Sequence, residues 1–146
     1  MLDTTGASAT VPDDARAPHI LIVDDNATNR QILECFLGHL GATFLSVENG
    51  AEAVAANAAE PFDAILMDIQ MPVMDGLTAT REIRRQERAA PRAAIPIVVV
   101  SANCAPEDVR AALEAGAQQH VAKPITMNGL YAALSTACDA EQRAAA

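Results

Sequence analysis

The sequence predicts a single α/β domain built as a three-layer sandwich, with a parallel β-sheet covered by helices on both faces. Two observations carry this prediction. Short, continuous apolar runs alternate with amphipathic stretches along most of the chain, and a run that is apolar at consecutive positions is typical of a strand buried on both faces, as in parallel sheets. The chain has 146 residues, of which 51% are apolar and 20% charged, a composition typical of one compact domain.

The first β/α repeat covers residues 19–40. Residues 19–23 (HILIV) form a continuous apolar run that predicts a strand. Five apolar residues then recur at the spacing of one helical face: Ile32, Leu33, Phe36, Leu37 and Leu40. We therefore expect a helix whose apolar face packs on the sheet.

The second repeat begins with residues 43–47 (TFLSV), which predict a strand. Asn49, followed three residues later by Glu52, is typical of a capping box that opens a helix. We expect this helix to run through Ala59. A third strand over residues 62–67 and a third helix from Gly76 to about Arg88 continue the alternation.

Two further repeats complete the domain. Residues 97–100 (IVVV) predict a fourth strand, and Pro106 and Gly116 mark the two ends of a fourth helix. Residues 120–122 predict a short fifth strand. Thr126 is placed to cap a last helix, whose apolar residues lie three and four apart: Met127, Leu130, Tyr131 and Leu134.

Five such repeats restrict the topology of the sheet. Right-handed crossovers leave few arrangements, and strand order 2-1-3-4-5, the flavodoxin-like (βα)5 arrangement, is common at this size. We expect this domain to span residues 19–138. Residues 1–18 are small, polar and without periodicity, which predicts a flexible arm, and residues 139–146 lack an apolar stripe, which predicts a frayed tail.

Charge and cysteine content exclude several classes of function. Ten Lys plus Arg against nineteen Asp plus Glu give a formal charge of −9, so we expect neither nucleic acid nor an anionic membrane as a direct partner. No apolar run approaches the roughly 20 residues of a membrane span, and no signal peptide is evident, so we expect a cytoplasmic location. Cys35, Cys104 and Cys138 form no Cys-x-x-Cys pair and are expected to be reduced thiols.

Polar side chains cluster at the predicted strand ends. Asp24 and Asp25 follow the first strand, Asp68 the third, Ser101 the fourth and Lys123 the fifth. In the predicted order the topological switch point lies between the first and third strands, at their carboxyl ends, where ligands of such folds bind. We therefore expect these side chains to converge on one crevice.

The residue types at this crevice indicate phosphate chemistry. Three carboxylates repel one another unless a cation intervenes, and an oxygen-only cluster suits a hard ion such as Mg²⁺, which keeps waters and phosphate as ligands. Asp68 is a candidate nucleophile, because a carboxylate can attack phosphorus and form an acyl phosphate. Ser101 and Lys123 could donate to phosphoryl oxygens. Taken alone, the Asp24–Asp25 pair fits turn formation or helix capping equally well.

Four segments resemble the receiver domain of two-component response regulators, in the same order and spacing. They are LIVDDN (21–26), ILMDIQMPVMDG (65–76), VVVSAN (98–103) and AKP (122–124). Each fragment is weak alone, but together they are specific, and the resemblance covers about residues 19–138.

The resemblance implies a role for each residue of the crevice. Asp24, Asp25, Asp68 and the backbone carbonyl of Gln70 would bind Mg²⁺. Asp68 would accept phosphate from a histidine kinase or a histidine phosphotransfer protein, while Ser101 and Lys123 bind the phosphoryl group. It also implies a cis Lys123–Pro124 peptide bond and a non-enzymatic signalling role that ends in contacts with a downstream protein. The LIVDDNATNR stretch is similar to receivers of hybrid kinases and phosphorelays.

One residue departs from the usual receiver pattern, and two others lie at positions that in receivers affect hydrolysis of the acyl phosphate. Receivers usually carry Tyr or Phe three residues before the lysine, as a partner of the Ser101 switch, whereas this chain has His120. An imidazole can also swing between buried and exposed positions, but His120 could equally be a polar residue at the start of an edge strand. Gln70 and Asn103 are neutral amides, so they could orient or obstruct water but could not act as bases.

Three other functions are compatible with the predicted fold. A haloacid-dehalogenase-type phosphatase also forms an aspartyl phosphate, but it needs a second Asp at the position of Gln70. A flavodoxin-like cofactor binder needs a Gly- or Thr-rich turn after the first strand, and this turn is acidic. A degenerate receiver could act in docking alone, although Asp68, Ser101 and Lys123 are all present.

Two surfaces call for a simpler interpretation. Four arginines lie at helical spacing in the third helix: Arg81, Arg84, Arg85 and Arg88. Because Glu82 and Glu87 lie between them, we interpret them as a solvated helix end and not as a basic binding stripe. The apolar face of the first helix is mostly core, with a part that could dock a kinase or phosphotransfer helix.

Overall fold

The computed structural model describes residues 17–145 apart from 72, 90–93 and 103–104, together with side chains as far as residue 137. Most of the expected N-terminal arm, and the side chains of Asn103, Cys104 and Cys138, lie outside this description. Cys35 is a free, exposed thiol.

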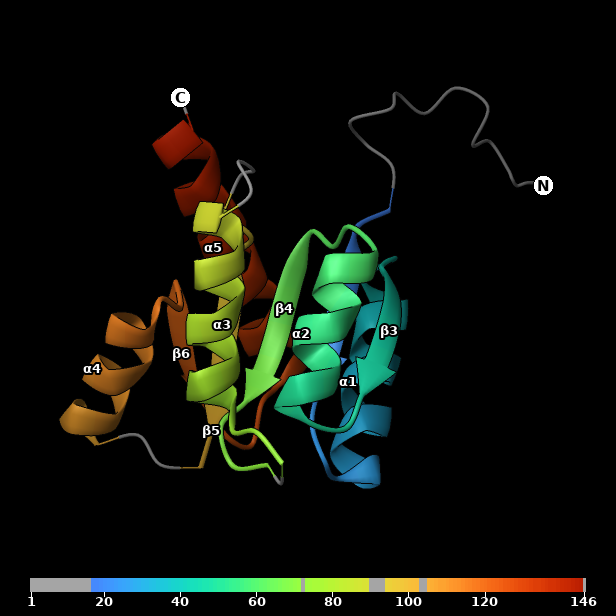
Figure 1. The fold of residues 1–146 in the computed structure, drawn as a ribbon. Coiled ribbons are helices and arrows are strands. Elements are labelled where there is room, and N and C mark those ends of the chain that lie inside the picture. The colour runs from blue at the N-terminus through green and yellow to red at the C-terminus, as the bar shows by residue number, and fades with distance from the viewer. Residues whose placement is uncertain (1–16, 72, 90–93, 103–104, 146) are drawn as a thin grey trace.

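One parallel sheet forms the centre of the described chain (Figure 1). Its strands run in the order β3-β2-β4-β5-β6, which confirms the predicted order 2-1-3-4-5. The strands are β2 (His19–Val23), β3 (Thr43–Val47), β4 (Ala64–Asp68), β5 (Ile97–Ser101) and β6 (Gln119–Ala122). All pairings are parallel, for example Val23 with Val47 and with Met67, so all strands end at the same edge of the sheet.

Helices cover both faces of the sheet (Figure 1). They are α1 (Ala27–His39), α2 (Gly50–Ala59), α3 (Gly76–Ala89), α4 (Pro106–Ala115) and α5 (Met127–Ala145). Alternate residues of β2 enter different cores: Leu21 packs with residues of α2, α3 and α4, whereas Ile22 packs with residues of α1 and α5. The predicted three-layer sandwich is therefore confirmed.

Local sequence signals define several helix ends. The Asn49 side chain caps α2 by accepting a hydrogen bond from Glu52 N at 2.9 Å, and the Glu52 carboxylate accepts one from Glu48 N at 2.8 Å. Gly116 ends α4 with φ of 119°, a conformation that favours glycine. Thr126 accepts from Gly129 N at 3.0 Å and so caps α5, as expected.

Burial differs from the sequence prediction at several apolar residues. β3 lies at the sheet edge, as the predicted strand order implies, and its apolar residues Phe44 and Leu45 are 39% and 37% exposed. We expected Ile32 and Tyr131 on packed helix faces, but they are 42% and 60% exposed. In both helices the packed stripe is narrower than the apolar pattern: α1 buries Leu33 and Leu37.

The interpretation of the α3 arginines as a solvated helix end is wrong for Arg84. Its side chain is only 12% exposed and pairs with buried Glu87 at 2.8 Å. The guanidinium also donates to the Gly116 carbonyl at 2.9 Å and to Gln118 Oε1 at 2.8 Å. Glu87 in turn accepts from Ile95 N, just before β5, and Gln118 accepts from Ile97 N, the first residue of β5. Arg84 thus ties α3 to the segment between α4 and β6.

The two ends of the described chain can be compared with the expected domain boundaries at residues 19 and 138. Pro18 O accepts a hydrogen bond from Thr43 N at 2.8 Å, and α5 continues to Ala145. The flexible arm and the frayed tail stay predictions. Among the described helices, none combines the length and apolar character needed to cross a membrane.

Candidate functional site

The carboxyl edge of the sheet carries the polar residues that the sequence placed there. Asp24 follows β2 directly, Asp68 ends β4 and Ser101 ends β5. These three residues are only 2%, 6% and 3% exposed, respectively. Lys123 follows β6 and is tied to the same edge, because its backbone N donates to Ser101 O at 2.9 Å. The parallel topology therefore brings together residues up to a hundred positions apart.

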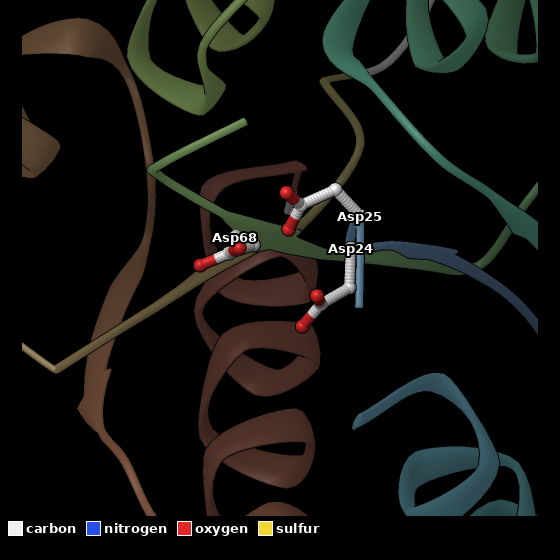
Figure 2. Close-up of side chains that lie close together, drawn as sticks. All are labelled: Asp24, Asp25 and Asp68. Carbon is white, nitrogen blue, oxygen red and sulfur yellow. The ribbon is translucent and has the colours of Figure 1, made fainter. Parts of the chain in front are cut away.

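Three carboxyl groups form a cluster at this edge. One oxygen from each of Asp24, Asp25 and Asp68 lies within 4.8 Å of the others. Figure 2 shows that Asp24 and Asp25 reach the cluster from the end of β2, whereas Asp68 reaches it from β4. Asp24 and Asp68 are buried and Asp25 is exposed, so the cluster has one open side.

Asp24 is held in place by its own loop. Its Oδ1 accepts a hydrogen bond from Asn26 N at 2.8 Å, and its backbone N donates to Val47 O at 3.2 Å. Asn26 in turn caps α1 by accepting from Asn29 N at 3.0 Å. The asparagines of the LIVDDNATNR stretch therefore shape the loop that presents this carboxylate.

Lys123 supplies a cation to the cluster. Its Nζ lies 3.2 Å from Asp68 Oδ1 and 3.6 Å from Asp24 Oδ2. The Lys123–Pro124 peptide bond is cis, as the resemblance implied. One lysine thus faces both buried carboxylates.

The electrostatics of the cluster favour a bound cation. Burial of Asp68 and the neighbouring charge of Asp24 raise the pKa of the Asp68 carboxyl above its ordinary value, although Lys123 acts in the opposite direction. Clustered hard oxygen donors are the ligands that Mg²⁺ prefers. The residues present therefore fit a divalent cation.

The segment after β4 is folded back tightly against the site. Gly76 N donates to Ile69 O at 2.8 Å, and a side chain at Gly76 would collide with the Asp68 backbone. Val73 adopts φ of 70°, a left-handed conformation that is unfavourable for a β-branched residue. Gln70, whose carbonyl we predicted as a metal ligand, is an exposed residue of this segment.

Asp75 caps the helix that follows this segment. Its carboxylate accepts hydrogen bonds from Thr78 N at 2.9 Å and from Thr78 Oγ1 at 3.0 Å. Burial acts to raise the pKa of Asp75, but the hydrogen bonds from Thr78 and Leu77 N, together with the charge of Arg81, outweigh it and hold the pKa below its ordinary value. Asp75 is therefore a structural carboxylate, distinct from the cluster.

His120 points into the molecule from β6. It pairs in register with Val99 of β5, and its Nε2 is buried with no hydrogen-bond partner in the described part of the chain. A polar atom shielded from water without a partner is costly, which distinguishes His120 from an ordinary polar residue at a strand end. Its action as a switch with Ser101 stays a prediction.

Sequence reasoning missed Arg30, the fourth residue of α1. Its Nη1 donates to the Asp24 carbonyl at 2.8 Å. The position of Arg30 in the sequence could have indicated this contact, because a long side chain in the first turns of a helix can reach back over the preceding loop.

Comparison with known proteins identifies the family. The model of the response regulator receiver domain matches residues 20–135, which is nearly all of the domain. The chain belongs to the response regulator receiver family. It is thus a receiver of the kind used in two-component and phosphorelay signalling.

The curated relatives of this receiver include much larger sensor kinases. The chain is 40% identical over 112 residues to the sensor histidine kinase GacS of Pseudomonas protegens, covering 77% of this chain and 12% of that kinase. It is 34% identical over 134 residues to the sensor histidine kinase RcsC of Salmonella typhi, covering 92% of this chain and 13% of that kinase. The chain therefore spans only about an eighth of the length of these relatives.

Two solved structures are similar in fold and in sequence. One is the receiver domain of the sensor histidine kinase PA1611 from Pseudomonas aeruginosa, with a magnesium ion coordinated in the active site cleft. Its TM-score with this chain is 0.75 and its sequence identity is 36%, over 84% of this chain and 98% of that one. The other is the receiver domain of Ssk1 from Saccharomyces cerevisiae, in complex with the histidine phosphotransfer protein Ypd1, with a TM-score of 0.77 and 30% identity over 82% of this chain and 88% of that one.

Proposed function

We propose that this receiver accepts a phosphoryl group on Asp68 from a phosphohistidine donor and then changes its contacts with a downstream protein. The observation that carries the proposal is the position of Asp68: a buried carboxylate at the end of β4, beside two further carboxylates and 3.2 Å from Lys123 Nζ. The protein is then a phosphoacceptor that takes part in its own modification, and not an enzyme with a separate substrate.

The transfer step needs an ionised Asp68. One carboxylate oxygen attacks phosphorus, the bond from phosphorus to the donor imidazole nitrogen breaks, and the electron pair of that bond stays on the imidazole. Lys123 already faces Asp68, so it is placed to donate to a phosphoryl oxygen after transfer. Ser101, at the neighbouring strand end, is placed to offer its hydroxyl to another phosphoryl oxygen.

Asp24, Asp25, Asp68 and the Gln70 carbonyl are the proposed Mg²⁺ ligands. When bound, the ion would neutralise charge on the group being transferred. The three carboxylates support this assignment because their oxygens lie within 4.8 Å of one another. The magnesium ion of the similar Pseudomonas aeruginosa receiver adds support.

The acceptor is tested by incubating the chain with acetyl phosphate and Mg²⁺, followed by intact-mass analysis and Phos-tag electrophoresis. We expect wild type to gain one phosphoryl group, and both Asp68→Asn and an EDTA-treated sample to stay unmodified. Labelling of Asp68→Asn at the wild-type level would show that Asp68 is not the acceptor. If neither acetyl phosphate nor a panel of phosphorylated phosphotransfer proteins labels wild type, the chain is a docking-only receiver.

The donor protein is proposed to dock beside the site, on α1. A pocket of about 360 Å³ opens there, and its lining includes Asp24 and Lys123 of the site together with apolar Ile32 and Ile125. Ile32 is 42% exposed, next to Leu33, which is buried. An apolar surface that borders the acceptor suits a helix of a histidine phosphotransfer protein, and the similar Ssk1 receiver was solved with such a protein.

Docking is tested by comparing two phosphoryl donors on the Ile32→Ala variant. Phosphorylation by acetyl phosphate should be unchanged, because a small donor needs no docking surface. Transfer from a phosphorylated phosphotransfer protein should slow by about tenfold, which corresponds to loss of an apolar interface contact worth about 1.4 kcal/mol. Equal rates with the protein donor would exclude Ile32 from the docking surface.

A further inference from the structure

Arg30 connects two loops at the carboxyl edge of the sheet. Its Nη1 donates to the Asp24 carbonyl at 2.8 Å, and its Nη2 lies 3.9 Å from Glu48 Oε2, just after β3. The Arg30 side chain is 17% exposed, whereas that of Glu48 is 68% exposed. The short hydrogen bond to Asp24 is therefore the principal contact, because water screens a longer ion pair to an exposed carboxylate.

The connection continues from the β3–α2 loop to the loop that follows Asp68. Gly50 N donates to Met74 O at 3.0 Å, and a side chain at Gly50 would collide with Met74. Gly76 N then donates to Ile69 O at 2.8 Å, next to Asp68. The loop bearing Asp24 and the loop bearing Asp68 are thus joined through a third loop that contributes no carboxylate to the cluster.

We propose that Arg30 is a positioning residue of the cation site, which fixes the Asp24 loop relative to Asp68 so that both carboxylates are available to Mg²⁺. Asp24 is held at its backbone N by Val47, at Oδ1 by Asn26 and at its carbonyl by Arg30. Removal of the Arg30 hydrogen bond releases the carbonyl side of this loop. The inference rests on the proposed cation site, because it assigns a residue that supports the ligands of that site.

The direction in which Mg²⁺ affinity changes when Arg30 is removed distinguishes a positioning role from an effect of its charge. Arg30 is a cation close to a site for a divalent cation, so its charge alone opposes Mg²⁺ binding. If Arg30 acted only through charge, its removal would tighten Mg²⁺ binding. If it positions Asp24, its removal weakens binding, since loss of a group that orients a metal ligand typically costs 10-fold or more in metal affinity.

The test measures cation affinity directly. Isothermal titration calorimetry with Mg²⁺ and electron paramagnetic resonance with Mn²⁺ would be run on wild type, Arg30→Met and Arg30→Lys. We expect Arg30→Met to weaken binding by about 10-fold. Arg30→Lys keeps the charge and one hydrogen bond but loses the planar fork, so it should fall between Arg30→Met and wild type.

Arg88→Met is the matched control, because it removes an exposed arginine from the last turn of α3 and should leave the affinity unchanged. Thermal unfolding in EDTA would verify that each variant is folded. Tighter or unchanged Mg²⁺ binding by folded Arg30→Met, with wild type binding normally, would overturn the positioning role alone. No Mg²⁺ binding by wild type would overturn the cation site and the role of Arg30 together.

Discussion

Asp68 combines burial with two like-charged neighbours, and this combination sets the sign of its contribution to stability. Its pKa is raised from an ordinary value near 3.8, first by burial and then by Asp24. A carboxyl with a raised folded-state pKa binds its proton more tightly in the folded chain, so the free energy of unfolding falls as pH rises from about 3.8 through the folded-state pKa. Without a cation, Asp68 therefore stabilises the fold less at neutral pH than at acid pH.

Asp68→Asn should accordingly stabilise the cation-free chain at pH 7.5, on the order of 1 kcal/mol. Urea unfolding in EDTA at pH 7.5 and pH 4 would measure the difference between variant and wild type. The difference should shrink at the lower pH, where more of the wild-type Asp68 is protonated. A variant less stable than wild type at pH 7.5 would show that the Lys123 ion pair outweighs burial and repulsion.

Val73 is under backbone strain in the segment that follows Asp68. With φ of 70° and a side chain 83% exposed, it has little burial to offset the cost of a left-handed conformation. That cost is about 1–2 kcal/mol for a residue with a Cβ, and asparagine tolerates the conformation better. Val73→Asn should therefore raise the free energy of unfolding by about 1 kcal/mol, as measured by urea titration.

The control for this prediction is Val73→Ala, which removes the β-branch but keeps the Cβ. It should recover less stability than Val73→Asn. Equal gains from the two variants would assign the effect to lost side-chain crowding instead of φ.

Helix α3 is anchored by a polar network and not by apolar contacts alone. Arg84 is its centre, since it bonds Glu87, Gly116 and Gln118, and the last two belong to the connection from α4 to β6. Substitution by Met keeps the volume but leaves buried Glu87 without its cation. Loss of one partner from a buried ion pair costs about 3–5 kcal/mol, so Arg84→Met should lower the free energy of unfolding by roughly 3 kcal/mol.

The neighbouring pair on the same helix provides the comparison. Arg85 and Glu82 are also three residues apart and 2.6 Å from each other, but the Arg85 side chain is 64% exposed. Water screens such a pair, so Arg85→Met should cause no measurable change in a urea titration. Similar losses for Arg84→Met and Arg85→Met would mean that the Arg84 network is not a specific anchor.

These two pairs also show where sequence reasoning reaches its limit. The alternation of strands and helices follows from local periodicity and caps, which is why Asn49, Pro106 and Gly116 placed helix ends correctly. Arg84 and Arg85 are identical residues at adjacent positions, and only the contact of α3 with the connection from α4 to β6 buries one of them. Ile32 was misplaced for a related reason, because residues 123–125 after β6 line a pocket with Ile32 and leave it 42% exposed.

The topology of the whole sheet explains why the position of the candidate site was easier to predict than the burial of individual side chains. In a parallel sheet every strand ends at one edge, so Asp24, Asp68, Ser101 and Lys123 needed only the correct strand order to be placed together. The contacts that hold the loops around these residues are harder to predict than the strand order. The hydrogen bonds of Arg30 to Asp24 and of Gly50 to Met74 leave no periodic signal.

The same convergence couples the cation to the stability of the whole domain. The proposed ligands meet only in the folded chain, so Mg²⁺ at about 100 times its dissociation constant should stabilise wild type by about 2.7 kcal/mol.

Protons compete with the cation, and the raised pKa of Asp68 makes this competition begin at a higher pH than for an ordinary aspartate. The Mg²⁺-dependent rise in melting temperature should therefore be largest near pH 7.5 and smaller at pH 4.5. Differential scanning fluorimetry across this range, with Asp24→Asn as the ligand-deficient control, would measure it. A Mg²⁺ effect that is independent of pH, or retained in Asp24→Asn, would place the stabilising cation elsewhere on this acidic protein.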